Sequence, residues 1–330
     1  MTGAELEHYC LDRGYRNFHG IQLYKWIYNR FAENFDEMTD LPLSLRKLLN
    51  EEFVLDYFKP IKIVYSGDRS AVKYSFPIDK TCIEAVVLSD RNGRTSFCIS
   101  SQAGCPARCL FCATGRIGLI KNLTKEEIIN EIYSLIKLHK IPDSILFMGM
   151  GEPLLNYTNV KKTIEMLHDA GIGFRKITVS TCGIVKKIHD LALSGLRPRL
   201  AVSLGSAIEE KRIKLIPISK YNDLKALKKA VIFYREKTKR RVSIEYTIIK
   251  DVNDTTKDAH ALADFAKQAG THVNVIRFNP VDGNDLCAPR AGKVNQFKTI
   301  LKDRGIEVSE RYRRGADIRA ACGQLVPDRI

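Results

Sequence analysis

Three closely spaced cysteines constrain this chain more than any other feature of its sequence. Cys105, Cys109 and Cys112 form a C-x3-C-x2-C run within residues 104–115. Three thiolates on one short loop can bind three irons of a cubane [4Fe–4S] cluster. The next cysteine along the chain is Cys182. The run therefore predicts a cluster whose fourth iron is open to another ligand.

Zinc and a metal-free trio of thiols are the alternative interpretations of the same run. A structural zinc site usually has four ligands from paired C-x2-C or cysteine–histidine knuckles. The nearest histidine is His139, at the far end of an expected helix, so a second knuckle is missing. The spacing therefore favours an iron–sulfur cluster, and a purely structural set of thiols is the remaining alternative.

The composition of the chain is that of an ordinary globular protein. It has 330 residues, 45% of them hydrophobic and 28% charged, which is enough for one large domain and an accessory segment. Nine cysteines, an odd number, in a chain without a secretion signal indicate metal or redox chemistry rather than a disulfide framework. No apolar run approaches the roughly 18 residues that span a bilayer. These features predict a cytoplasmic protein without a membrane partner.

The chain carries a large excess of basic residues. Its 53 lysines and arginines outnumber 38 aspartates and glutamates, which gives a net charge of +15. Such an excess favours a polyanionic partner, because each neutralised phosphate releases condensed counterions. No basic amphipathic anchor helix stands out, which disfavours a membrane surface. Nucleic acid is therefore the expected partner, and a basic but unspecialised surface is the alternative.

Changes in hydrophobic period divide the chain into three segments. Residues 1–55 have the helical spacing of a small bundle with a basic face, which either binds RNA or only packs against the core. Residues 56–94 contain runs of β-forming residues separated by tight turns, which predicts a short antiparallel linker region. Residues 95–330 alternate strands and helices. We therefore predict an α/β protein in which a helical domain and a β linker precede a larger core.

Repeated strand–helix units in the core predict a parallel, partial (β/α)6-type barrel. The first strand covers residues 95–100, and a capping box at Thr124 and Glu127 opens the helix after the cysteine loop. Further strands are expected at residues 144–148, 176–179, 199–203, 242–248, 273–278 and 306–309. Helices are expected between them at residues 160–170, 185–193, 224–236, 259–269 and 294–302.

Polar and glycine-rich segments follow several of these strands. Parallel barrels place their chemistry on loops at the carboxyl ends of the strands, so these segments are expected to converge on one pocket. They are the cysteine loop, residues 149–153, Ser180, residues 203–205, Asn279 and residues 315–324. A lone Gly-x-Gly or Asn-Pro is usually only a turn, so the prediction of a pocket depends on their shared placement.

The cysteine loop resembles that of radical S-adenosylmethionine (SAM) enzymes, in which an aromatic residue, here Phe111, lies between the last two cysteines. In a pocket that holds SAM beside the cluster, the open iron can chelate its amino and carboxylate groups. The glycines of residues 149–151 would let the backbone approach closely, and Glu152 would pair with the ammonium group. Ser180 and Asn279 would supply hydrogen bonds.

Over nearly its whole length the sequence resembles the RlmN/Cfr family of radical-SAM adenine methyltransferases. The matching segments are residues 97–105, the cysteine loop, residues 148–153 and residues 315–325. The last of these is highly specific, since generic radical-SAM enzymes lack it. The resemblance implies a radical-SAM barrel that methylates carbon 2 of adenine in ribosomal RNA, and often also in tRNA.

The resemblance also implies how the reaction proceeds. Cys322 takes a methyl group from one SAM, and a second SAM is cleaved reductively at the cluster to a 5′-deoxyadenosyl radical. That radical removes a hydrogen atom from the methyl group, and the resulting carbon radical adds to adenine. Cys98 then attacks the Cys322 sulfur and resolves the RNA adduct as a disulfide, which an external reductant resets. A one-electron donor of the flavodoxin or ferredoxin type is the implied partner, and Glu84 is the implied proton acceptor.

The residues implied to bind the two cofactors come from the loops named above. The cluster ligands are Cys105, Cys109 and Cys112. The SAM contacts are Gly151, Glu152, Ser180, Ser203, Leu204, Gly205 and Asn279. The family usually has a histidine where this chain has Gly205, so a contact made by the imidazole would be missing here.

The sequence is also compatible with other interpretations. Without the resemblance, Cys98 and Cys322 would be interpreted as packed thiols. Pro153 favours the carbon-2 branch over the carbon-8 branch of the Cfr type, whose motif reads Gly-Glu-Ala. A metal-stabilised RNA-binding protein without catalysis would use the basic clusters at residues 235–241 and 311–314. The presence of both Cys98 and Cys322 argues against it, because a protein that only binds RNA has no need of that pair.

Removing any one of the three clustered cysteines should remove the cluster. Cys105→Ala, Cys109→Ala and Cys112→Ala are each expected to lose the visible iron–sulfur absorption after anaerobic reconstitution, because one iron loses its thiolate. Cys10→Ala is the matched control, since Cys10 is expected to be structural. Full retention of the absorption in any of the three variants would contradict the assignment.

Overall fold

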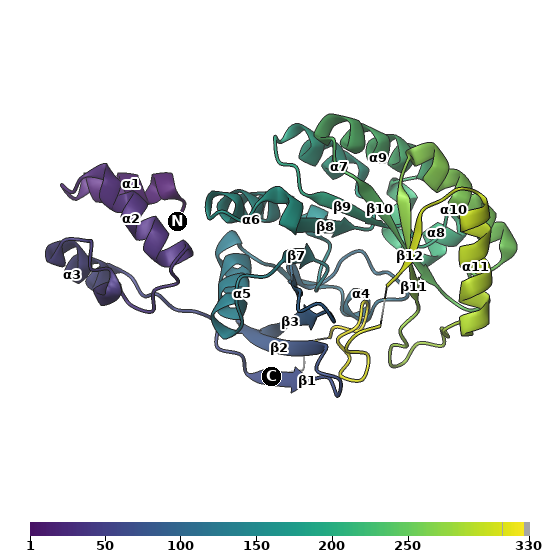
Figure 1. The fold of residues 1–330 in the computed structure, drawn as a ribbon, viewed down its shortest axis with the longest axis horizontal. Coiled ribbons are helices and arrows are strands. Elements are labelled where there is room, and N and C mark those ends of the chain that lie inside the picture. The colour runs from purple at the N-terminus through teal and green to yellow at the C-terminus, as the bar shows by residue number, and fades with distance from the viewer. Residues whose placement is uncertain (312, 327–330) are drawn as a thin grey trace.

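The N-terminal segment folds into helices that stand at one end of the molecule (Figure 1). The computed structural model describes residues 1–311 and 313–326. The helices are α1 (Gly3–Asp12), α2 (Asn17–Tyr28) and α3 (Leu43–Glu52), with a short 3-10 helix, η1 (Phe35–Glu37), before α3. Tyr24 of α2 donates a hydrogen bond to the carbonyl of Met166 (3.1 Å), and the ring of Tyr28 packs on that of Tyr133. The helical segment therefore contacts the helices of the core.

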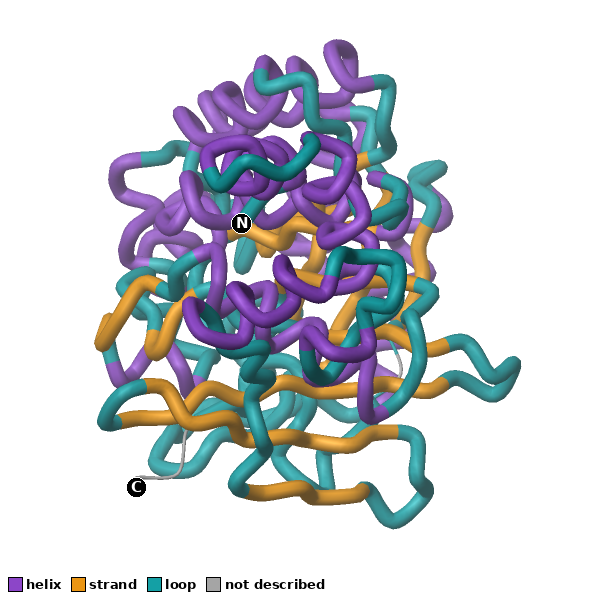
Figure 2. The backbone as a smooth tube through the Cα atoms, turned by 90° about the vertical axis from the view of Figure 1, so that its left-hand side faces the viewer, coloured by secondary structure: helices purple, strands orange, loops and turns teal. Residues whose placement is uncertain are grey.

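Antiparallel strands lie along one side of the molecule, beneath the helices in the view of Figure 2. They are β1 (Lys62–Tyr65), β2 (Ala71–Ile78) and β3 (Thr81–Ser89), which pair in that order. β3 also pairs antiparallel with β4 (Thr95–Cys98), and β4 in turn is the first strand of the parallel core. The antiparallel strands are thus continuous with the core sheet.

Within this sheet the strands from β4 onward are parallel, and their order in the sheet follows their order in the sequence. They are β7 (Ser144–Phe147), β8 (Ile177–Thr181), β9 (Arg199–Ser203), β10 (Val242–Ile248), β11 (His272–Arg277) and β12 (Val308–Glu310). The helices between them are α5 (Lys125–Leu138), α6 (Tyr157–Asp169), α7 (Val185–Leu193), α9 (Leu224–Thr238), α10 (Thr256–Ala269) and α11 (Ala291–Asp303). They cover the outer face of the curved sheet (Figure 1). The predicted α/β architecture, with a mostly parallel sheet behind helices and antiparallel strands, is confirmed.

Short elements surround the cysteine loop and fill the other connections. β5 (Gln102–Gly104) and β6 (Leu119–Asn122) form a separate antiparallel pair, and α4 (Ala113–Ile117) lies between them. The other short elements are α8 (Glu209–Leu215), η2 (Pro153–Asn156), η3 (Phe174–Lys176) and η4 (Pro217–Tyr221). The β5–β6 pair was not predicted from the sequence, because strands of three or four residues are too short to show the alternation of apolar and polar side chains.

Strand β10 illustrates how the two faces of the barrel wall differ. Ile244 and Tyr246 are fully buried, and the Tyr246 ring stacks on Phe297 of α11. On the opposite face of the strand, Glu245 and Thr247 line a pocket inside the barrel. Because side chains alternate along a strand, one face packs against helices and the other is available for polar chemistry.

The described residues contain no helix that combines the length and the apolar character needed to cross a membrane. The buried apolar side chains instead form one hydrophobic core cluster, which runs from Leu6 of α1 to Leu325. The helical segment, the antiparallel strands and the barrel are therefore held together by the same burial of apolar surface.

Gly149, just beyond β7, lets two loops approach closely. Its N–H donates to the carbonyl of Ile99 (2.9 Å), and the N–H of Met150 donates to Oγ of Ser100 (2.9 Å). A Cβ atom at position 149 would lie 2.6 Å from the Ile99 oxygen, inside van der Waals contact with backbone. The segment before the cysteine loop and the loop after β7 are thus joined directly.

Gly149→Ala is therefore expected to destabilise the protein by about 1–3 kcal/mol, since the methyl group must push backbone aside. A lower midpoint of urea unfolding would measure this loss. Gly173→Ala is the matched control, because a Cβ atom at that position meets nothing within 4 Å. Equal midpoints for the two variants would show that the close approach does not constrain residue 149.

Candidate active site

The cysteine loop is fastened at several points by backbone hydrogen bonds. The N–H of Cys105 donates to the carbonyl of Gly118 (2.8 Å), and that of Leu110 donates to Leu215 (2.9 Å). At the far end of the loop, the N–H of Ala113 donates to the carbonyl of Gly323 (2.7 Å). The loop is thus tied both to the barrel and to the C-terminal loop.

Two adjoining pockets open at the carboxyl ends of the parallel strands. The first, here the trio pocket, has a volume of about 150 Å³ and is lined by the three clustered cysteines. The second, here the thiol-pair pocket, has a volume of about 300 Å³ and is lined by Cys98 and Cys322. Cys112, Arg311 and Cys322 line both pockets. The two cavities therefore form one continuous site.

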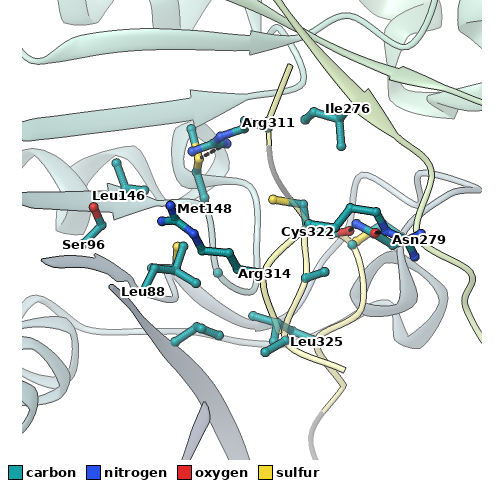
Figure 3. A pocket seen from close by; sticks show the side chains of 18 of the residues that line it. Leu88, Ser96, Leu146, Met148, Ile276, Asn279, Arg311, Arg314, Cys322 and Leu325 are labelled. Carbon is teal, nitrogen blue, oxygen red and sulfur yellow. Dashed lines mark hydrogen bonds between the residues drawn. The ribbon is translucent and has the colours of Figure 1, made fainter. Parts of the chain in front are cut away.

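Most of the predicted site residues meet in these two pockets. Those in the trio pocket are Cys105, Cys109, Cys112, Gly151, Glu152, Ser180, Ser203 and Cys322. Asn279 lies in the lining of the thiol-pair pocket, as do Cys98 and Cys322. Asn279 is seen beside Cys322 in Figure 3. The prediction that loops far apart in sequence converge on one pocket is confirmed for these residues.

Leu204 and Gly205 line neither pocket. Leu204 is fully buried, and its N–H donates to the carbonyl of Glu245 (3.0 Å). The Gly205 carbonyl accepts a hydrogen bond from Nδ2 of Asn253 (2.7 Å). Gly205 has a φ of 69°, and a Cβ atom there would lie 2.9 Å from Ile216. The backbone conformation at this position suits glycine, which differs from the histidine expected from the resemblance.

Glu84 is likewise outside the lining of both pockets. Its side chain on β3 is 1% exposed and forms an ion pair with Nζ of Lys73 (2.8 Å). Its Oε2 accepts a hydrogen bond from the N–H of Val326 (2.8 Å). Glu84 therefore fastens the C-terminal loop that carries Cys322 to the antiparallel strands.

The clustered thiols suit a group that brings positive charge. Burial raises the pKa of Cys105 to about 12, and it raises the pKa of Cys109 well above its usual value. Thiolates in this position are costly on their own, and a cationic metal centre would stabilise them. No three His, Cys, Asp or Glu side chains of the described residues are grouped to hold a single metal ion. Three cysteines that line one pocket are the donor set that an iron–sulfur cluster uses.

The opposite wall of the trio pocket suits a polar organic cofactor. Glu245 is 5% exposed, and its Oε2 has no hydrogen-bond partner within the described ranges. That oxygen lies 3.7 Å from Nη1 of Arg311, an ion-pair distance too long for a hydrogen bond. Ser180 and Ser203 add hydroxyl groups on neighbouring strands. These groups match the ammonium and hydroxyl groups of a ligand such as SAM.

Cys98 and Cys322, which are far apart in the sequence, both line the thiol-pair pocket. The pKa of Cys98 is raised to about 12, mainly because the thiol is buried and to a smaller extent because the Cys322 thiol lies nearby. The backbone of Cys322 is held by Asn279, whose Nδ2 donates to its carbonyl (3.0 Å), while Oδ1 of Asn279 accepts from Nε of Arg313 (2.8 Å). All nine cysteines are free, so the disulfide implied by the resemblance is not formed in this structure.

Arg212 is a structural member of the site that the sequence analysis missed. Its side chain is fully buried and donates hydrogen bonds to the carbonyls of Leu204 and Cys182, the latter at 2.7 Å. These carbonyls lie just beyond the ends of β9 and β8. The only signal in the sequence is an arginine in a short helical segment, which is usually a solvated residue.

Comparisons with known proteins agree with the geometry. Residues 99–266 match the model of the radical SAM superfamily, and residues 1–55 match that of the ribosomal RNA large subunit methyltransferase N-terminal domain. A relative from Thermotoga petrophila, named probable dual-specificity RNA methyltransferase RlmN, is 41% identical over 335 residues, covering 100% of this chain and 97% of the relative. A relative of the same name from Christiangramia forsetii is 35% identical, covering 98% and 94%.

A solved structure is similar over the whole fold. The crystal structure of a radical SAM methyltransferase from Sphaerobacter thermophilus superposes with a TM-score of 0.92 at 36% sequence identity. The match covers 98% of this chain and 97% of that one.

Replacing Arg212 should weaken the packing of the loops after β8 and β9. Arg212→Leu is expected to lower the free energy of unfolding by about 2–4 kcal/mol, because two buried carbonyls lose their donors. Urea unfolding would measure the change. Lys214→Leu, an exposed position on the same helix, is the control and should change the free energy little. An Arg212 variant as stable as the control would contradict this role.

Proposed function

Since the chain belongs to the RlmN family of radical-SAM RNA methyltransferases, we propose that it methylates carbon 2 of an adenine in ribosomal RNA and in tRNA. The family membership rests on identity of 35–41% to curated relatives over nearly the full chain. The protein is thus an enzyme that acts on RNA, and the alternative of a non-catalytic RNA-binding protein loses its support.

One observation carries the proposed reaction. Cys98 and Cys322, separated by more than two hundred residues, line the same pocket, and Cys322 also lines the pocket of the clustered cysteines. A methyl carrier must face both the source of the methyl group and the thiol that later releases the product. The shared lining of the two pockets gives Cys322 this double access.

Membership of the radical SAM superfamily implies a [4Fe–4S] cluster and SAM. We propose that Cys105, Cys109 and Cys112 bind one cluster and that two SAM molecules are consumed in each turnover. Gly151, Glu152, Ser180 and Ser203 would contact SAM in the trio pocket. When bound, the cluster and SAM supply a methyl group and a 5′-deoxyadenosyl radical.

The thiols of this chain perform the remaining steps. Cys322 loses its proton, accepts the methyl group on sulfur, and then gives up one hydrogen atom from that carbon. After the carbon has bonded to carbon 2 of adenine, the adduct gives up one electron to an external one-electron carrier and its carbon-2 proton to Glu84, the proposed acceptor. Cys98 then loses its proton and attacks the Cys322 sulfur, so that the bond between this sulfur and the added carbon breaks. The carbon takes up a proton, and the methylated base leaves a Cys98–Cys322 disulfide behind. Two electrons, supplied one at a time by an external donor of the flavodoxin or ferredoxin type, and two protons reduce the disulfide and restore both thiols. Asn279 keeps Cys322 in reach by holding its carbonyl.

We also propose roles for Glu84, for two residues next to the pockets and for the three segments of the chain. Glu84 is proposed as the proton acceptor, although its contacts with Lys73 and Val326 also give it a part in holding the Cys322 loop. Leu204 and Gly205, which line neither pocket, are proposed to support the strand end that carries Ser203 rather than to contact SAM. Residues 1–55, 56–94 and 95–330 are proposed as an RNA-binding domain, a linker region and the catalytic core. The cytoplasmic location also remains a prediction.

Nucleoside mass spectrometry tests the proposed function directly. The enzyme is reconstituted anaerobically with iron, sulfide, SAM and reductant and then incubated with unmethylated ribosomal RNA and with tRNA. The expected product is 2-methyladenosine in both. The appearance of 8-methyladenosine would move the enzyme to the carbon-8 branch, and SAM cleavage without any methyladenosine would contradict the proposed substrate.

Variants of the two thiols should fail at different steps. Cys322→Ala is expected to abolish product and to form no adduct, because the methyl carrier is missing. Cys98→Ala should accumulate protein linked covalently to RNA, which a denaturing gel would reveal as a slower band. Cys287→Ala is the matched control, since Cys287 is exposed and outside both pockets. Normal turnover of Cys98→Ala without an adduct would contradict the resolving role.

A further inference from the structure

Arg314 places a positive charge inside the thiol-pair pocket. Its side chain reaches from the C-terminal loop toward Met148 and the side on which Leu88 and Ser96 lie (Figure 3). Arg314 is half-buried, and no side chain or carbonyl in residues 1–311 and 313–326 forms a hydrogen bond or ion pair with its guanidinium. A half-buried guanidinium that lines a cavity and has no hydrogen-bond partner among the described residues can bind an anionic ligand.

The other charges around this pocket are already engaged. Arg311 faces the carboxylate of Glu245 at 3.7 Å, and Arg313 donates through Nε to Asn279. Glu310, the acidic residue in the lining, forms an ion pair with Lys298. Among the described lining residues, Arg314 is thus the arginine whose guanidinium forms neither a hydrogen bond nor an ion pair.

Part of the pocket wall is apolar. Its side chains come from β3, β7, β11 and the C-terminal loop, and they are Val86, Leu88, Leu146, Ile276 and Leu325. A volume of about 300 Å³ lies at the lower end of the range of about 300–1,000 Å³ for ligand pockets. An apolar wall beside a guanidinium suits a nucleotide, whose flat base needs apolar contact and whose phosphate needs a charge-assisted donor.

We propose that Arg314 binds a phosphodiester group adjacent to the target adenosine, so that the base of that nucleotide lies between the apolar wall and the two thiols. This inference rests on the proposed function, because it identifies how the RNA substrate enters the same site. It also requires that the target nucleotide be unpaired, since a base inside a duplex cannot reach the thiols.

The position of Arg314 distinguishes this role from cofactor binding. Arg311 lines both pockets, whereas Arg313 and Arg314 line only the thiol-pair pocket. The clustered cysteines and Glu152 lie in the trio pocket. The anion that Arg314 receives therefore enters from the side of Cys98 and not from the side of the cofactor.

Binding of RNA to the reconstituted enzyme without SAM tests the proposal. The probe is a fluorescent RNA hairpin whose single-stranded loop carries one adenosine, titrated at several KCl concentrations. Arg314→Gln is expected to weaken binding about tenfold, the effect of one lost charge-assisted contact. It should also make the slope of log affinity against log salt shallower by about 0.7, the value for one phosphate of a single strand.

Two further variants separate the contact from general charge effects. Arg304→Gln removes the same charge from an arginine that pairs with Asp264 outside both pockets, and it should retain the wild-type slope. Arg314→Lys keeps the charge without the planar fork, so the slope should stay while affinity falls by less than in Arg314→Gln. Thermal unfolding midpoints equal to the wild type would show that all three variants are folded.

A modified RNA locates the phosphate. Replacing the phosphate on the 5′ or the 3′ side of the adenosine by a neutral methylphosphonate should weaken wild-type binding about tenfold at one of the two positions. The same replacement should cost the Arg314→Gln variant nothing more, because both changes remove one contact. Additive losses at both positions, or an Arg314→Gln variant that binds as the wild type does, would overturn the proposal.

These readouts are independent of the methylation test. RNA binding without SAM involves no chemical step, so the coupling between Arg314 and a phosphate can be present even if 2-methyladenosine is not formed. Such a result would leave the phosphate contact standing and overturn the proposed function alone. Conversely, normal methylation without the coupling would overturn only the role of Arg314.

Discussion

Two hydrogen bonds between the start of α4 and the C-terminal loop hold the site together. The N–H of Ala113 donates to the carbonyl of Gly323 (2.7 Å), and the hydroxyl of Thr114 donates to the carbonyl of Leu325 (2.6 Å). Ala113 and Gly323 directly follow Cys112 and Cys322 in the chain, and Thr114 and Leu325 lie two and three residues after them. Without this connection the clustered cysteines and the Cys322 thiol would belong to separate surfaces. With it, both thiol groups line one continuous cavity.

Buried charged side chains fasten the other loops in the same manner. Glu131 accepts the N–H of Ser100, Glu152 accepts those of Leu154 and Cys182, and Arg212 donates to two loop carbonyls. Glu131 is fully buried, and this burial raises its pKa well above the usual range. Each group offsets part of its desolvation by bonding to backbone that no strand partner satisfies. The loops that meet at the pockets are thereby fixed before any ligand binds.

Local signals in the sequence predicted a large part of this arrangement. The spacing of the three cysteines, the alternation of strands and helices and the capping box at Thr124 each involve residues close together in the chain, and each is present in the structure. Glu84 and Arg212 could not be assigned in this way. The contact of Glu84 with Val326 joins residues 242 apart, and Arg212 resembles any exposed arginine of a short helix until the fold encloses it. The β5–β6 pair was too short to show a period.

The sequence by itself determined the family, the parallel core and the set of thiols, because hydrophobic period and ligand spacing are properties of neighbouring residues. Only the tertiary structure decided which of these residues share a cavity. It brought Cys98 and Cys322 to one pocket, left Leu204 and Gly205 behind the wall, and aimed Arg314 into the space beside the thiols. The physical reason is that a parallel sheet gathers the ends of distant strands at one edge, and the contacts made there depend on the whole path of the chain.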